Sequence, residues 1–198
     1  MSVTLNASTS SGLVQTADTS GTIELQSNGT TRLTVASTGA YGQLVSATAQ
    51  ASTSGTAIDF TGIPSWVKRI TVMFNGVSTS GTSIPLIQIG DSGGIETTGY
   101  LGSCSWIRSG TPVSASPTTG LGLVANPLAA DVMHGQAVLV NMESNVWSLV
   151  FNGALSSAAN TLNAGASKTL SATLDRVRIT TTNGTDTFDA GSINILYE

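Results

Sequence analysis

Residues 70–76 read ITVMFNG, and this stretch is the clearest indication of fold class in the chain. Its large apolar side chains (Ile, Val and Phe) alternate with Thr and Met, which is the two-residue period of a strand buried on one face. The Asn-Gly pair that closes the stretch is a turn signal. No segment shows a sustained helical period, so we predict an all-β fold with an antiparallel β-sandwich or jelly-roll-like domain. Similar short segments recur at residues 84–89, 100–107, 121–125, 136–142, 146–152, 168–182 and 185–197.

The composition of the 198 residues excludes several classes of protein. Only 9% of the residues are charged, against about 25% in an ordinary soluble domain, whereas the chain contains 29 threonines, 27 serines and 22 glycines. The net charge of −4 and the lack of a basic run argue against nucleic-acid binding. No apolar stretch approaches the roughly 18 residues of a membrane span, and the N-terminus shows no secretory signal, so we expect no membrane insertion.

The chain has one cysteine, Cys104, and one histidine, His134. A single cysteine cannot form an internal disulfide or a cysteine-rich metal site, and its place in a strand pattern favours a buried, inert thiol. We expect His134 to be a surface or turn residue, because Asp131 lies nearby but no third ligand does. We therefore predict no metal site and no cofactor.

Residues 1–57 differ from residues 58–198 in composition. The first segment holds a single aromatic residue and few large aliphatic ones. That is too little apolar area to offset a backbone ordering entropy of about 1–2 kcal/mol per residue. We predict an N-terminal stem in residues 1–57 and a self-contained C-terminal knob in residues 58–198.

The clearest feature of the stem is a hairpin around Asn28-Gly29. A three-residue loop would place Ile23 opposite Leu33, whereas a two-residue loop would divide the apolar residues between two faces. We predict the three-residue loop, with the glycine in the left-handed conformation. Nothing in the stem covers the resulting apolar face, so we expect it to contact copies of the chain or another protein. The predicted interface residues are Ile23, Leu25, Leu33 and Val35.

Turn signals predict two hairpins in the knob. One is closed by a Ser-Asn turn and places Val140 opposite Leu149. The other is closed by Asn183-Gly184 and places Arg178 opposite Asp189, which would be a favourable cross-strand charge pair.

Residues 90–94, GDSGG, spell the nucleophile motif of chymotrypsin-like serine proteases, with Ser92 as the nucleophile. That chemistry requires a histidine and an aspartate before the serine, and the only histidine, His134, follows it. We interpret the motif as a tight turn after the strand at 84–89. The carboxylates are too few and too scattered to assign a glycosidase pair. We therefore assign no catalytic residue and predict that the protein is not an enzyme.

Aromatic residues are the candidates for carbohydrate stacking, because an aromatic ring can pack on the apolar face of a sugar. Trp147 alternates with large apolar residues and is expected in the core, and Trp66 is expected at one end of the sandwich. Trp106 precedes a loop rich in Gly, Pro and Ser at residues 109–120 and is the best candidate for a binding surface. The predicted ligand-binding residues are Tyr100, Trp106 and Arg108.

Several stretches resemble fibres and related virion proteins of tailed bacteriophages. Residues 21–42 (GTIELQSNGTTRLTVASTGAYG) resemble the stem modules that precede fibre head domains. Residues 58–78 (IDFTGIPSWVKRITVMFNGVS), continuing to residues 87–100, resemble the opening strands of small fibre knobs, and residues 175–198 resemble their closing hairpin. The resemblance implies a homotrimer displayed on the virion, without catalysis, and made in the cytoplasm of a bacterial host.

The leading hypothesis is therefore a short tail fibre or receptor-binding tip. Its stem would contact other virion proteins, and a host-surface glycan is a candidate ligand. Tail fibres are usually much longer than this chain, so a capsid decoration or cement protein, or a head fibre, is the alternative. A carbohydrate-binding module is a second alternative. The absence of a secretory signal argues against it, and so does a stem that cannot cover its own apolar residues.

Overall fold

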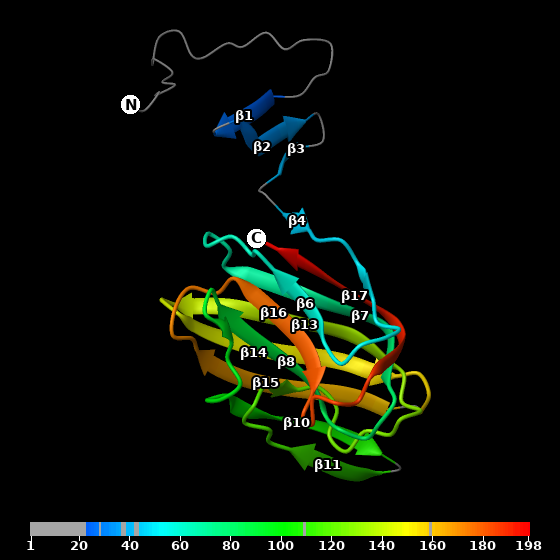
Figure 1. Ribbon diagram of the computed structural model, residues 1–198. Helices are drawn as coiled ribbons and strands as arrows, with labels where there is room; N and C mark the ends of the chain where they lie inside the picture. The colour runs from blue at the N-terminus through cyan, green and yellow to red at the C-terminus, as the bar shows by residue number, and fades with distance from the viewer. Residues whose placement is uncertain (1–22, 28, 37–38, 42–43, 109, 159) are drawn as a thin grey trace, which may run out of the picture. The chain divides into compact units, whose positions relative to one another are not determined.

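The computed structural model describes residues 23–198 except residues 28, 37–38, 42–43, 109 and 159 (Figure 1). Within these ranges all regular secondary structure is β-strand, and every strand pairing is antiparallel. The prediction of an all-β, antiparallel fold is confirmed. The chain divides into two compact units, and the division follows Leu44.

The first unit is a three-stranded sheet in the order β1-β2-β3. Its strands are β1 (Ile23–Ser27), β2 (Thr30–Ala36) and β3 (Gly39–Tyr41). The predicted hairpin is present, and Gly29 has the predicted left-handed backbone with φ of 72°.

The register of this hairpin differs from the prediction. Ile23 was expected opposite Leu33 across a three-residue loop, and this is wrong. A register shift after Leu25 places an extra residue in β2, which is a bulge that the hydrophobic pattern does not reveal. The apolar residues nevertheless pair with one another across the two strands. The observed pairs are Ser27–Thr30, Leu25–Leu33 and Ile23–Val35.

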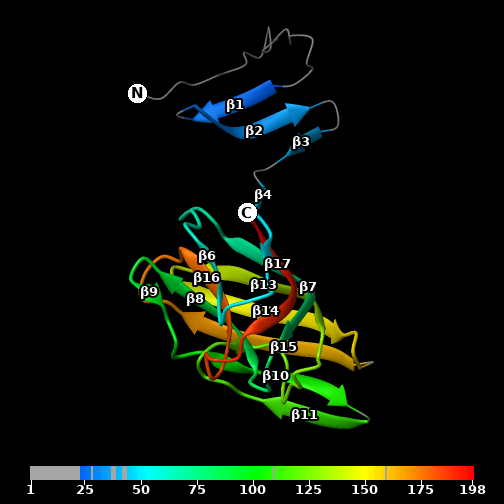
Figure 2. The same cartoon turned by 45° about the vertical axis from the view of Figure 1, so that its right-hand side comes forward.

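The second unit contains a nine-stranded and a five-stranded sheet (Figure 2). The nine-stranded sheet has the order β11-β10-β15-β14-β13-β7-β17-β4, and β5 also pairs with β17. Its strands are β4 (Val45–Ser46), β5 (Gln50–Ala51), β7 (Arg69–Thr79), β10 (Leu101–Arg108), β11 (Thr111–Ala115), β13 (Met133–Glu143), β14 (Val146–Leu155), β15 (Asn160–Thr169) and β17 (Phe188–Tyr197).

The five-stranded sheet has the order β12-β8-β16-β6, and β9 pairs with β8. In Figure 1 it lies in front of the larger sheet. Its strands are β6 (Ile58–Thr61), β8 (Pro85–Asp91), β9 (Gly94–Ile95), β12 (Leu121–Gly122) and β16 (Arg176–Thr181).

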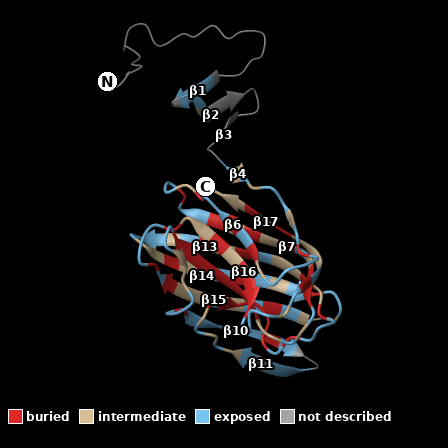
Figure 3. Ribbon diagram, viewed as in Figure 1, coloured by how far each residue is buried: buried red, intermediate tan, exposed pale blue. Residues whose placement is uncertain are grey.

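The two sheets share one hydrophobic core, which gives the second unit a sandwich-like layout. The predicted alternation in β7 is confirmed, because Ile70, Val72 and Phe74 are all buried. The smaller sheet contributes residues such as Ile89 and Val177 to the same cluster. In Figure 3 the buried residues are concentrated on the strands of the two sheets, and the connecting loops are mostly exposed.

The sandwich begins earlier than the predicted boundary at residue 58. Strands β4 and β5 both pair with the last strand, β17. Ser52 follows β5 and is fully buried, with its N–H donating to Gly191 O at 3.0 Å and its hydroxyl donating to Ala190 O at 2.8 Å. Residues 45–57, predicted as stem, are therefore part of the second unit.

The β13–β14 hairpin is present, but its predicted register is wrong by one residue. Val140 pairs with Ser148, and Leu139 pairs with Leu149. The reason is a register shift at Met142, between Asn141 and Glu143, which exchanges the inward-facing and outward-facing residues in the preceding part of β13. As a result, Leu139 points into the core and Val140 points to the outer face.

The predicted hairpin at Asn183-Gly184 is not formed. Strand β16 pairs with β6 and β8 in the smaller sheet, whereas β17 pairs with β7 in the larger one. The chain crosses from one sheet to the other at this turn. Arg178 accordingly pairs with Asp59 on β6 and not with Asp189.

The first prediction concerns the boundary between the two units. Deleting residues 1–44 should leave the sandwich with unchanged stability, whereas deleting residues 1–57 should lower the free energy of unfolding by about 3 kcal/mol. The larger deletion removes β4, β5 and Ser52, and each lost hydrogen bond costs about 1 kcal/mol. Urea unfolding followed by tryptophan fluorescence measures both values. Equal stability of the two truncated chains would contradict the observed pairing with β17.

Candidate functional site

The aromatic residues predicted to bind ligand are in the core. Trp106 is 2% exposed and Tyr100 is 1% exposed, so neither presents a ring face to a glycan. Residues 111–115 of the loop predicted at residues 109–120 form β11, which pairs with β10 from Cys104 to Arg108. The side chain of Arg108 lies outside the described part of the structure. The burial of both rings is thus at odds with a stacking surface at this place.

The other tryptophans and the cysteine differ in how far they are buried. Trp147 is buried in the core as predicted. Cys104 is buried as well, and burial raises the pKa of its thiol. Trp66 is 38% exposed and lies 6.0 Å from the ring of Tyr197.

The protease-like motif forms the turn between β8 and β9, as predicted. Gly90 is required there, because a Cβ atom on it would lie 2.0 Å from Gly94 O. The carboxylate of Asp91 accepts hydrogen bonds from Ser171 Oγ at 2.6 Å and from Gly93 N at 2.7 Å. These bonds, that of Ser171 first, hold the pKa of Asp91 below its ordinary value. The carboxylate therefore has a structural role in closing the turn.

His134 has partners outside this motif. It lies on β13, where its Nδ1 accepts a hydrogen bond from Gly76 N at 3.2 Å. Its Nε2 lies 3.2 Å from Ser156 Oγ. The described bonds of His134 and of the motif therefore form two separate networks.

A charged network joins the β9–β10 loop to the end of β15. Lys168, only 6% exposed, forms an ion pair with Glu96, which is 22% exposed. Glu96 also accepts a hydrogen bond from Ser171 N at 2.7 Å. Burial alone would raise the pKa of Glu96, but Lys168 and Ser171 outweigh it, so the pKa lies below its ordinary value of 4.5.

Tyr100 also belongs to this network. Its hydroxyl accepts a hydrogen bond from Ile89 N at 2.7 Å and donates to Glu96 O at 3.1 Å. The Lys168 ammonium lies 5.7 Å from the centre of its ring. Burial raises the pKa of the Tyr100 phenol, so this group stays protonated at neutral pH. The described bonds of all these groups hold loops.

The second prediction tests this network. Glu96→Gln should lower the free energy of unfolding by about 2 kcal/mol at pH 7, because it leaves Lys168 without a countercharge and weakens a charged hydrogen bond. A carboxylate with a lowered folded-state pKa stabilises the fold above its unfolded pKa and loses that effect as the pH falls through the folded pKa. The difference between the variant and the wild type should therefore shrink as the pH falls below 4.5, the ordinary pKa of the carboxyl group, and through the lowered pKa of Glu96.

The matched control for this experiment is Glu143→Gln. Glu143 is exposed at the end of β13, so this variant should stay within about 0.5 kcal/mol of the wild type in urea unfolding. A constant difference between Glu96→Gln and the wild type at all pH values would show that the ion pair does not supply the stabilisation.

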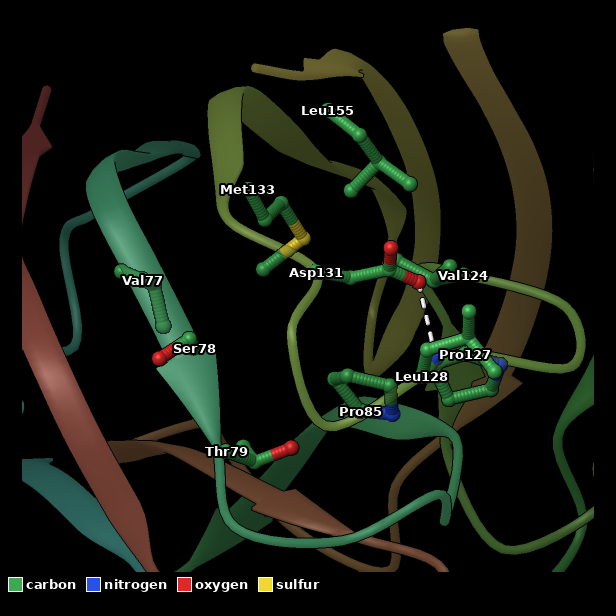
Figure 4. A pocket seen from close by; sticks show the side chains of 10 residues that line it. All are labelled: Val77, Ser78, Thr79, Pro85, Val124, Pro127, Leu128, Asp131, Met133 and Leu155. Carbon is green, nitrogen blue, oxygen red and sulfur yellow. Dashed lines mark hydrogen bonds between the residues drawn. The ribbon is translucent and has the colours of Figure 1, made fainter. Parts of the chain in front are cut away.

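One enclosed cavity lies beside Asp131 (Figure 4). Its volume is about 20 Å³, which is room for about one water molecule. Asp131 is buried there and accepts a hydrogen bond from Leu128 N at 2.8 Å, while Met133 and Leu155 line the apolar side. The cavity is too small for a substrate, and Asp131 serves to hold the turn that precedes β13.

The outer face of the nine-stranded sheet carries an uncharged surface on β10, β15, β14 and β13, which we call the open face. It is bordered on β7 by Arg69, which pairs with Val140 and forms an exposed ion pair with Glu198. Val150 pairs with Val138 and with Gly165 across adjacent strands, and Val140 and Leu101 lie in the next row. Val150 is 43% exposed, Val140 41% and Leu101 74%. The open face consists of Leu101, Ser103, Ser105, Val138, Val140, Ser148, Val150, Asn152, Asn163, Gly165 and Ser167.

The outer face of the five-stranded sheet is different, because it is hollowed and polar. Two hollows of about 310 and 290 Å³ share Thr97 and Arg178 and therefore adjoin each other. Arg178 bonds to both carboxylate oxygens of Asp59 at 2.7 Å. We call the two hollows together the polar trough. Its polar lining includes Thr56, Asp59, Thr61, Gln88, Thr97, Thr119, Arg176, Arg178, Thr180 and Thr182.

Comparisons with known proteins add no family to this description. No protein-family model, curated protein or solved structure matches the chain. Among the described residues, no group of three His, Cys, Asp or Glu side chains could hold a metal ion, and no helix is present that could cross a membrane. The geometry therefore defines a class only: an antiparallel, sandwich-like β protein whose larger sheet has an outer face with exposed apolar residues and whose smaller sheet has a polar outer face.

Sequence reasoning missed both outer faces for identifiable reasons. The open face depends on the register shift at Met142, without which Val140 would point inward. The polar trough depends on pairing Arg178 with β6, which lies more than a hundred residues away in the sequence. The one available signal was the run of alternating polar residues in β16 and β6, Arg176 and Arg178 facing Thr61 and Asp59.

Proposed function

We propose that the protein is a non-enzymatic structural protein of a phage virion, a homotrimeric short tail fibre or receptor-binding tip. The observation that carries this proposal is the open face, because in a monomer its apolar residues would remain exposed to water. A contiguous exposed surface with apolar residues and no charge is typical of a protein–protein contact. The resemblance to fibre stems and knobs implies three copies of the chain and a place on the virion.

The composition of the open face favours contact with copies of the same chain. Its residues are uncharged and the bordering Arg69 is paired with Glu198, so a second copy can approach with little repulsion between like charges. Small residues such as Ser103 and Gly165 allow close approach of another backbone or side chain. Amides such as Asn163, whose Nδ2 donates to Asn152 Oδ1 at 2.7 Å, can still donate and accept across an interface.

The three-stranded sheet supports attachment by the N-terminal unit. Leu25 is 45% exposed although it lies opposite Leu33, another apolar residue. The side chains of Ile23 and Val35 lie outside the described part of the structure. The same sheet from neighbouring copies, or a virion surface, would cover the exposed Leu25. The positions proposed for that contact remain Ile23, Leu25, Leu33 and Val35.

The third prediction tests assembly. Light scattering of the purified protein should give three times the chain mass of 20.0 kDa. Val150→Lys should shift the protein to the monomer, because three unpaired ammonium groups would be buried at the contact. Thr173→Lys, which adds the same charge at an exposed loop position, should remain trimeric. A wild-type protein that is monomeric or dimeric at micromolar concentration contradicts the proposal, as does a trimeric Val150→Lys.

The fourth prediction tests the location. Gold-labelled antibodies against the protein should mark the tail end of the parent particle in electron micrographs. Label distributed over the head would instead favour the capsid decoration or head-fibre alternative. Particles without any label would exclude the virion setting and leave the carbohydrate-binding module as the remaining hypothesis.

A further inference from the structure

We propose that the polar trough binds a neutral, polyhydroxylated chain, namely an uncharged polysaccharide. This inference builds on the proposed function, since a receptor-binding protein needs a ligand site, but it rests on separate observations. The trough lies on the five-stranded sheet and shares no residue with the open face. Assembly and ligand binding are therefore assigned to opposite sheets.

The shape of the trough suits an extended ligand. Each hollow is about the size of a small ligand site, and sites for such molecules begin near 300 Å³. Because the hollows adjoin at Thr97 and Arg178, a chain molecule can occupy both at once. Both hollows are open to solvent, so the ends of the chain can continue beyond them.

The charges of the trough are balanced, and this argues for a neutral ligand. Arg178 is paired with Asp59 through Nε and Nη2. Arg176 is paired with Asp175 in the same way, at 2.6 and 3.1 Å. Two guanidinium groups and two carboxylates cancel, so the site has no excess positive charge with which to attract a phosphate or a nucleic acid.

The hydrogen-bonding groups of the trough match a ligand that both donates and accepts. The bonds that the structure describes for Arg176 and Arg178 leave the N–H groups of each Nη1 to donate. Gln88 donates from Nε2 to Thr119 O at 2.8 Å, which fixes the side chain and leaves its carbonyl oxygen to accept. Thr180 already donates its hydroxyl proton to Thr56 O at 2.8 Å, whereas an exposed hydroxyl such as that of Thr97 can both donate and accept. Sugar hydroxyls are the ligand groups that use such a mixed set in full.

The charged groups of the trough are held in fixed positions, which favours binding of a ligand. Arg176 and Arg178 are two residues apart on β16 and so lie on the same face of the sheet, roughly 7 Å apart. Each guanidinium is held by a two-point ion pair, which reduces the rotamer entropy lost on binding. The trough has no aromatic lining residue. Each trough should therefore bind weakly, and three troughs in a trimer would supply affinity through multivalency.

The fifth prediction uses electrophoresis of the full chain in native gels that contain a dissolved polysaccharide. Dextran and galactomannan serve as neutral probes and polygalacturonate as the acidic one. The wild type should be retarded by at least one neutral probe and not by polygalacturonate. Thr97→Leu should weaken the apparent affinity about tenfold, because Thr97 lines both hollows and the change removes a hydroxyl while adding bulk.

The neighbouring residue provides a matched control. Thr98 is exposed like Thr97 but lines neither hollow, so Thr98→Leu should be retarded as the wild type is. Thermal unfolding should confirm that both variants keep the wild-type stability. Failure of both neutral probes to retard the wild type overturns the inference. So does retardation by polygalacturonate, or equal retardation of Thr97→Leu and the wild type. Light scattering on the same samples tests the proposed function separately. A protein that is trimeric but is not retarded would contradict polysaccharide binding by the trough and leave the proposed trimer intact.

Discussion

Burial of the apolar side of β7 is the interaction on which the rest of the structure depends. This strand lies between β13 and β17 in the nine-stranded sheet and faces the five-stranded sheet with Ile70, Val72 and Phe74. Phe74 meets Phe151 edge-to-face, with ring centres 5.7 Å apart and planes at 82°. Each such side chain contributes about 1.5–3 kcal/mol when fully buried. The Phe74–Phe151 contact lies within the larger sheet, and the burial of β7 against the smaller sheet is the main source of stability in a chain with so few charges.

The ion pairs of the described residues are placed at loops and on exposed strand positions. Lys168 and Glu96 hold one loop, and the paired Arg176 and Arg178 lie beside the smaller sheet. The residues of the open face are uncharged, and the nearest charge is Arg69, which pairs with Val140 at its border. The two outer faces of the sandwich thus differ in chemistry, and this difference is what allows one face to serve for assembly and the other for a ligand.

Sequence patterns predicted the fold class because alternation along a strand reports directly on burial, as in Ile70–Phe74. They predicted Trp147 in the core and the turn at Gly90–Gly94 for the same local reasons. They failed where a single inserted residue changes the outcome. The bulges near Leu25 and Met142 shift register, and a shift of one residue exchanges the two faces of a strand. The burial of Trp106 and Tyr100 and the polar trough depend on contacts between distant strands, and local sequence does not contain them.

The pairing of β4 with the last strand also determines how a mechanical load would pass through the molecule. A pull on the chain that precedes Val45 enters the sandwich beside Tyr197, since these two residues are paired. From β17 the load reaches β7, whose hydrogen bonds to both neighbours extend along most of its length. The five-stranded sheet shares no backbone ladder with this path. Tension on the N-terminal unit would therefore enter the second unit through the larger sheet, whereas the polar trough lies on the smaller one.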